Sequence, residues 1–165
     1  MSNFDCSSIN GDVRNFLKHR RELNGRFFEF HSDMKNLSSN GFVLGDSSLK
    51  LTCVGELDQR CLCFSVEFDG FSFIFSCEYA LRDGRPCGVV SVFKRLNHDV
   101  SISEFLYSFH FDQMGNVNLM YGSGGMPLEN AQTSFAAISA LKLAIFSALS
   151  KKGAEYDKYL VGLPS

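Results

Sequence analysis

Hydrophobic spacing divides the chain into a helical stretch at each end and a stretch of strands between them. Near the N-terminus, apolar residues recur every three or four positions, with one gap at Arg20: they are Phe16, Leu23, Phe27, Phe30, Met34 and Leu37. This period is typical of one face of an amphipathic helix. It predicts a helix over residues 12–38, which Gly41 ends by taking a left-handed conformation.

Between residues 42 and 121 the apolar period changes to two, which is typical of strands with one buried face. Asp69-Gly70 and Asp83-Gly84 have the composition of two-residue type I′ hairpin turns. Pairing across the first turn places Phe64 opposite Phe75, and pairing across the second places Val92 opposite Phe75 as well. These registers gather the large apolar residues on one face of the predicted sheet.

The reverse face of that sheet is not wholly polar. The register that pairs Val92 with Phe75 also places Phe93 opposite Ile74. Exposed apolar patches mark contact surfaces, so we expect this pair to be covered by the first helix, by a loop or by another subunit.

A later alternation predicts a further strand, formed by the aromatic residues Phe105, Tyr107, Phe109 and Phe111. A three-residue loop over residues 113–115 then predicts three cross-strand pairs: Phe111 with Val117, Phe109 with Leu119, and Tyr107 with Tyr121. Residues 101–106 have a competing interpretation as a short helix, because Ser101 and Glu104 have the spacing of a capping box. We favour a strand from Phe105 onward.

The most apolar segment predicts a C-terminal helix over residues 127–150. Its larger apolar residues form one strip, Phe135, Ile138, Leu141, Ile145 and Leu149, and its small ones form a second, Ala136, Ala140 and Ala144. The sequence Lys151-Lys152-Gly153 is typical of a helix end and leaves a short tail over residues 153–165. The apolar run over residues 135–149 is shorter than the ~20 residues of a membrane span, so no span is expected.

These elements define an α+β fold in one domain over residues 1–165. An antiparallel meander of five to seven strands is flanked by a long N-terminal helix and an apolar C-terminal helix. The length of 165 residues and the lack of a Pro-rich linker or repeat agree with one domain. Because the chain has 17 Phe and no Trp, we expect a core rich in phenylalanine.

Charge and cysteine content narrow the partners and the compartment. The net charge of -2 gives no electrostatic reason to bind a polyanion, so nucleic acid is an unlikely partner. The first residues lack the basic and apolar regions of a secretory signal. We therefore expect a cytoplasmic protein whose six cysteines are thiols rather than disulfides.

No motif indicates catalysis, a cofactor or a metal. Ser108, His110 and Asp112 are residue types of a hydrolytic triad, but alternate residues of a strand lie about 6.5–7 Å apart, too far for the hydrogen bonds of a relay. Cys61 and Cys63 project from one face of a predicted strand and lack the spacing of a structural zinc site. We expect neither a cofactor nor a metal, and we expect the protein not to be an enzyme.

The order of elements has two resemblances at the level of topology. The helix–meander–helix order resembles the profilin-type arrangement, and residues 109–149 resemble the strand-turn-strand-helix ending of the type III secretion chaperones. The second resemblance implies a protein that binds another protein. Topology alone does not transfer function between families.

The leading hypothesis is a non-enzymatic, cytoplasmic protein-binding module, such as an inhibitor, an immunity protein or a secretion-chaperone-like factor. Its candidate interaction surface is formed by Ile74, Phe93, Leu143 and Phe146, and we expect a homodimer through these apolar faces. The alternative hypothesis is a small apolar ligand in a Phe-lined pocket between the sheet and the C-terminal helix.

Overall fold

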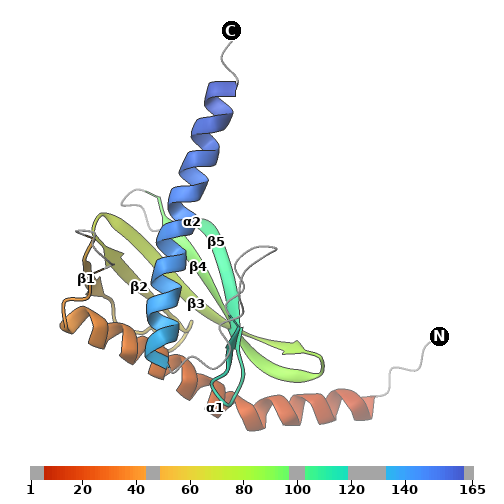
Figure 1. Cartoon of the computed structure of the whole chain (residues 1–165). Helices are drawn as coiled ribbons and strands as arrows, with labels where there is room; N and C mark the ends of the chain where they lie inside the picture. The colour runs from red at the N-terminus through yellow and green to blue at the C-terminus, as the bar shows by residue number, and fades with distance from the viewer. Residues whose placement is uncertain (1–5, 44–48, 97–102, 119–132, 162–165) are drawn as a thin grey trace.

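The computed structural model describes residues 6–43, 49–96, 103–118 and 133–161 (Figure 1). In chain order, the elements are α1 (Cys6–Ser39), β1 (Leu51–Val54), β2 (Cys63–Phe68), β3 (Phe71–Arg82), β4 (Arg85–Arg95), β5 (Ser103–Phe111), β6 (Val117–Asn118) and α2 (Thr133–Val161). The six strands form one antiparallel sheet in the order β1-β2-β3-β4-β5-β6. This confirms the predicted α+β fold with a meander sheet between two helices.

Helix α1 begins at Cys6, earlier than the predicted start at residue 12. Its C-terminal end is as predicted. Gly41 has a φ of 67°, its amide donates to the Ser38 carbonyl, and the Phe42 amide donates to the Leu37 carbonyl. These two bonds form a Schellman motif, in which apolar side chains on either side of the glycine close the end. Leu37 and Phe42 both pack against the core.

Both predicted Asp-Gly hairpins have their predicted registers. Phe64 pairs with Phe75, and on the other side Phe75 pairs with Val92. All four turn residues have positive φ, as a type I′ turn requires: 37° at Asp69, 87° at Gly70, 51° at Asp83 and 72° at Gly84. The turn chemistry and the alternating pattern therefore specify the same register.

Strand β5 differs from the prediction at one point. The chain is strand from Phe105 onward, as favoured, and β5 also includes residues 103–104. However, the register shifts between Val92 and Phe93: Val92 pairs with Tyr107, whereas Phe93 pairs with Phe105. Leu106 is thus an extra residue, a β-bulge, which moves Phe105 to the face opposite Tyr107. The predicted pair of Phe111 with Val117 is present. The predicted pairs with Leu119 and Tyr121 lie outside the described residues.

Helix α2 corrects two predictions. It continues through Gly153 to Val161, so Lys151-Lys152-Gly153 does not end it and residues 153–161 are not a tail. A glycine inside a helix costs only about 1 kcal/mol, which does not force an end when helix-forming residues follow. Residues 127–132, the predicted start, lie outside the described residues. The distal part of α2 extends past the edge of the sheet (Figure 1).

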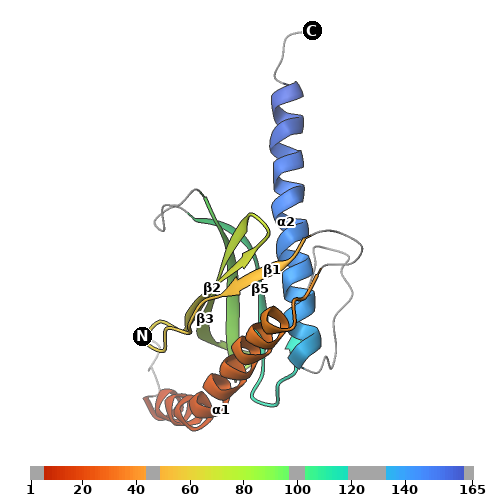
Figure 2. The same cartoon turned by 90° about the vertical axis from the view of Figure 1, so that its left-hand side faces the viewer.

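The two helices pack on the same face of the sheet (Figures 1 and 2). We call this the core face, and the opposite one the open face. On α1, the buried apolar residues are Leu23, Phe27, Phe30 and Met34, and His31 is buried as well. Phe30 contacts the rings of Phe64, Phe75 and Phe109 from three strands, with centroids 6.0, 5.8 and 5.7 Å away. The expected core rich in phenylalanine is therefore present.

Both predicted strips of α2 contribute to the core. Ala136, Ala140 and Ala144 are at most 1% exposed. Leu141 and Ile145 of the strip of larger residues are 0% and 3% exposed, whereas Leu149 of that strip is 52% exposed. Small side chains let a helix lie close to its neighbours, and here the neighbours are α1 and the central strands. The Tyr107 hydroxyl donates to the Ala140 carbonyl at 2.6 Å and ties β5 to α2.

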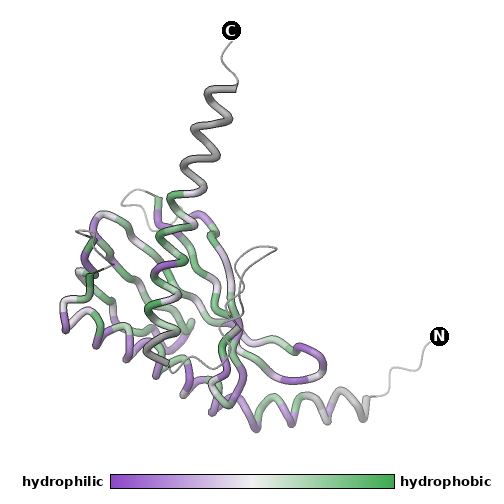
Figure 3. Tube along the Cα trace, viewed as in Figure 1, coloured by the Kyte–Doolittle hydropathy of each residue, from purple (hydrophilic) through white to green (hydrophobic). Residues whose placement is uncertain are grey.

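Polar residues concentrate away from this interior. Figure 3 shows hydrophilic positions along one side of α1 and at the turn of the long β3–β4 hairpin. No helix within the described residues is long and apolar enough to cross a membrane.

Candidate functional site

The open face carries a row of apolar side chains across three neighbouring strands. Ile74 on β3 pairs with Phe93 on β4, and Phe93 pairs with Phe105 on β5. The rings of Phe93 and Phe105 meet edge to face, with centroids 5.8 Å apart. Phe105 is 50% exposed. We call Ile74, Phe93 and Phe105 the apolar row.

The first helix does not cover this row. Helix α1 packs on the core face, which removes one of the three covers expected from the sequence. No other helix of the described part of the chain lies on the open face. Because Phe105 is half exposed, part of the apolar row is accessible at the surface.

Two polar atoms beside the row lack a hydrogen-bond partner among the described residues. They are Ser72 Oγ and Arg95 Nε, and both are buried. Ser72 precedes Ile74 by two residues and Arg95 follows Phe93 by two, so both side chains share the open face with the row. On its other flank runs a row of small residues: Cys63, Ser76, Ser91 and Ser108.

The four residues of the predicted interaction surface do not form one patch. Ile74 and Phe93 are neighbours on the open face, as predicted. Leu143 is partly buried and packs against the core, so it is not part of an exposed surface. Phe146 is 52% exposed on α2, on the opposite side of the sheet from Ile74 and Phe93. The prediction missed Phe105, because nothing in the alternating sequence marks the bulge at Leu106.

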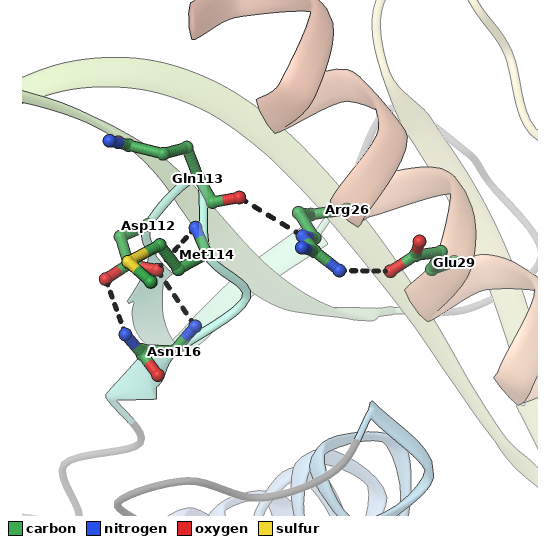
Figure 4. Close-up of polar contacts among 6 residues, drawn as sticks. All are labelled: Arg26, Glu29, Asp112, Gln113, Met114 and Asn116. Atoms are coloured by element: carbon green, nitrogen blue, oxygen red, sulfur yellow. Dashed lines mark hydrogen bonds and ion pairs between the residues drawn. The ribbon is translucent and has the colours of Figure 1, made fainter.

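A surface groove lies between α1 and the β5–β6 loop (Figure 4). Its volume is about 530 Å³, and its lining residues are Glu22, Gly25, Arg26, Glu29, Gln113 and Met114. Arg26 Nε donates to the Gln113 carbonyl at 3.2 Å, and Arg26 Nη1 pairs with Glu29 at 3.1 Å. The guanidinium is therefore occupied by groups of the chain itself.

The Asp112 carboxylate shapes the loop beside this groove. Its Oδ1 accepts the amides of Met114 and Asn116, each at 2.9 Å, and its Oδ2 accepts the Asn116 side-chain amide at 2.9 Å. Gly115 has a φ of 85°, which suits the predicted left-handed position. These bonds hold the conformation of the loop and give Asp112 a structural role, while the hydrogen bond from Arg26 to Gln113 joins the loop to α1 (Figure 4).

The cavity at the predicted ligand site is small. Between α1, the sheet and α2 it has a volume of about 20 Å³ and lies against Phe27, Phe30, Phe109, Phe111 and Ala136. A volume of this size holds about one water molecule. Among the described residues, the geometry therefore gives the apolar-ligand alternative no support.

Ser108, His110 and Asp112 do not meet as a triad. His110 lies against Arg82, whose Nη1 is 2.8 Å from Nδ1 and 2.7 Å from Nε2, while Asp112 is used by the loop. Burial and the nearby Arg82 charge lower the pKa of His110, and Asp112 opposes this shift. His110 therefore contacts Arg82 rather than the other two residues of the supposed triad.

Cysteine and other metal-binding side chains do not converge. Cys53, Cys61, Cys63, Cys77 and Cys87 are free thiols. Within the described ranges, no group of three or more His, Cys, Asp or Glu residues is arranged to hold a metal ion. Cys61 lies in the turn before β2 rather than in the strand, so the two thiols of Cys61 and Cys63 do not project from one strand face as predicted.

Comparison of the chain with protein-family models, curated proteins and solved structures gave no match. The two topological resemblances therefore receive no support from known proteins.

Proposed function

We propose that this chain is a non-enzymatic protein-binding module and that the open face of its sheet contacts the partner. The observation that carries the proposal is the apolar row, in which the half-exposed ring of Phe105 stands beside Phe93 and Ile74. Aromatic side chains are enriched at the centres of protein interfaces because they bury a large area with few rotatable bonds.

The polar surroundings of the row suggest the chemistry of the partner. A buried donor or acceptor without a hydrogen bond costs about 1–3 kcal/mol. Ser72 Oγ and Arg95 Nε are two such atoms beside the row. A partner that places an apolar side chain on the row and a carbonyl or carboxylate oxygen beside the Arg95 guanidinium would suit these surroundings.

A second copy of the chain is the first partner to test. Closed two-fold pairing of one surface is the commonest arrangement of soluble oligomers. The alanine strip of α2 is buried within one chain, so it does not offer a surface to a second copy. We therefore expect a homodimer to form through the open face.

Site-specific photo-cross-linking in the cells that make the protein tests this proposal. A photoreactive phenylalanine analogue replaces Phe105 in one variant and Phe146 in a matched control; the two positions are 50% and 52% exposed on opposite sides of the sheet. We expect a discrete protein adduct from position 105 and none from position 146.

The mass of the adduct identifies the partner, whether a second copy of 18.4 kDa or another protein. Equal adducts from both positions, or none from position 105, would overturn the proposal. Circular dichroism of both variants shows that the fold is retained.

A further inference from the structure

The turn between β1 and β2 holds two thiols close together. The Sγ atoms of Cys61 and Cys63 are 3.3 Å apart. Cys61 is exposed and Cys63 is partly exposed, so small molecules in solvent have access to the pair. Both thiols are free.

The backbone of this turn brings the thiols together. Alternate residues of an extended strand have Cα atoms about 6.5–7 Å apart, which is at the upper limit for a disulfide. Leu62, between the two cysteines, has a φ of 46° and folds the chain back on itself. Such a conformation costs a non-glycine residue roughly 1–3 kcal/mol and persists only where the surroundings enforce it.

Three contacts enforce the Leu62 conformation. The Leu62 side chain is buried in the core. Its carbonyl accepts the Cys77 amide at 2.9 Å, and Asp58 pairs with Cys63 across the base of the turn. The two thiols are therefore held near each other by the fold and do not meet by chance motion of a loose loop.

The two cysteines differ in their electrostatic surroundings. The pKa of Cys61 is raised to about 11, mainly by its hydrogen bond with Cys63 and next by its hydrogen bond with Asp58. Cys61 therefore stays protonated near neutral pH. Either Sγ can be the donor of the hydrogen bond between the two thiols. Because Cys61 stays protonated, we assign the first attack to Cys63.

We propose that Cys61 and Cys63 form a redox-active dithiol that is converted reversibly to an intramolecular disulfide by small disulfides of the glutathione class. The Cys63 thiolate attacks one sulfur of the small disulfide, whose S–S bond breaks and releases one thiolate. Cys61 then loses its proton to solvent and attacks the Cys63 sulfur, which releases the second small thiol. Two protein thiols are oxidised, and one small disulfide is reduced to two thiols.

The remaining described cysteines serve as internal references. Cys53 is an exposed free thiol on β1, so its expected product is a mixed disulfide with glutathione. Cys77 is buried, and burial raises its pKa to about 12, so it should stay reduced. Cys87 is buried too, and burial also raises its pKa.

The test equilibrates the full-length reduced protein in glutathione buffers of graded redox ratio, then blocks the free thiols with an alkylating agent and maps the peptides by mass spectrometry. We expect the peptide that contains residues 61 and 63 to lose two hydrogens and both alkylation sites at one common midpoint. Dithiothreitol should restore both sites. Under the same conditions, Cys53 should carry glutathione.

Two matched variants separate the pair from ordinary thiol reactivity. Cys61→Ser should convert Cys63 to a mixed disulfide with glutathione, and Cys53→Ser should leave the midpoint of the pair unchanged. The proposal is overturned if Cys61 and Cys63 each carry glutathione, if both stay alkylated where Cys53 has reacted, or if a non-reducing gel shows chains cross-linked through either residue. Far-UV circular dichroism confirms that the variants are folded.

Discussion

The two faces of the sheet contain the same residue type in different surroundings. On the core face, Phe75 is fully buried and stacks on Phe64 with ring centroids 5.3 Å apart, and Phe30 of α1 packs on it from above. On the open face, Phe105 contacts Phe93 at 5.8 Å and is half exposed. The difference shows that composition alone does not reveal which phenylalanines support folding and which form a surface.

The largest expected effect is at the centre of the core face. Phe75→Ala removes a ring that contacts both the sheet and α1, and it leaves a cavity that the packed neighbours cannot fill. We expect a loss of about 3–5 kcal/mol in the free energy of unfolding, measured by urea denaturation. A loss below about 1 kcal/mol would contradict this comparison, because a phenylalanine on the core face would then contribute no more to stability than an exposed one.

Gly88 tests how closely the core face is packed. The ring of Phe111 lies directly over Gly88, its partner across β4 and β5, and a Cβ at position 88 would overlap that ring. Gly88→Ala should therefore cost about 1–3 kcal/mol by overpacking. Gly25→Ala is the control: nothing lies within 4 Å of its added Cβ in α1, so it should stabilise the protein by about 0.5–1 kcal/mol.

Tyr107→Phe removes only the hydrogen bond from β5 to the Ala140 carbonyl. The ring remains, so we expect a loss of about 0.5–1.5 kcal/mol at neutral pH, measured by urea denaturation. If the substitution has no effect, the bond between the sheet and α2 does not contribute to stability.

The same tyrosine predicts the response to alkaline pH. Burial raises the pKa of Tyr107 above its ordinary value near 10, so the unfolded chain loses the phenolic proton first. Stability should therefore fall as the pH rises above about 10. Tyr107→Phe should reduce the slope of unfolding free energy against pH in that range, and an unchanged slope would contradict the assignment.

The smallest effect is expected on the open face. Phe105→Ser removes one edge-to-face contact and a half-exposed ring, so its cost in unfolding free energy should be less than about 1 kcal/mol. Phe146→Ser on α2 should have a similarly small effect. A cost for Phe105→Ser near that of Phe75→Ala would show that the apolar row supports the fold rather than a contact surface.

The sequence predicts the hairpins well because two independent signals agree there. Asp-Gly fixes the type of turn, and the alternation around Phe64 and Phe75 allows only one register to bury the large residues. The Gly41 cap was predicted for a similar reason, since the helical stripe stops at Leu37 and Gly41 follows after three polar residues.

The elements that escaped prediction lack such agreement. In α2, the spacing of large side chains correctly predicted that Leu141 and Ile145 are buried, but it wrongly included Leu149, which is exposed. Gly153 suggested an end that the helix does not make. In the candidate site, Ile74 and Phe93 followed from the register, whereas Phe105 did not, because the aromatic alternation from Phe105 to Phe111 reads the same with or without a bulge.

The extra residue at Leu106 acts as a phase shift in the period-two pattern of β5. Downstream of it, Tyr107 and Phe109 contribute to the interior, and upstream of it Phe105 contributes to the exterior. One strand thus contributes aromatic side chains to both faces of the sheet, and the change of face occurs at a single residue. In a regular strand, residues two apart lie on one face, so without the bulge Phe105 would share the core face with Tyr107. Deletion of Leu106 would make Phe105 and Tyr107 neighbours in regular alternation and keep the Phe105 ring on the open face, while the hairpin with β6 keeps its frame. The face on which Phe105 lies is therefore set by the strand register, without any change in the identity of the residues that form the strand.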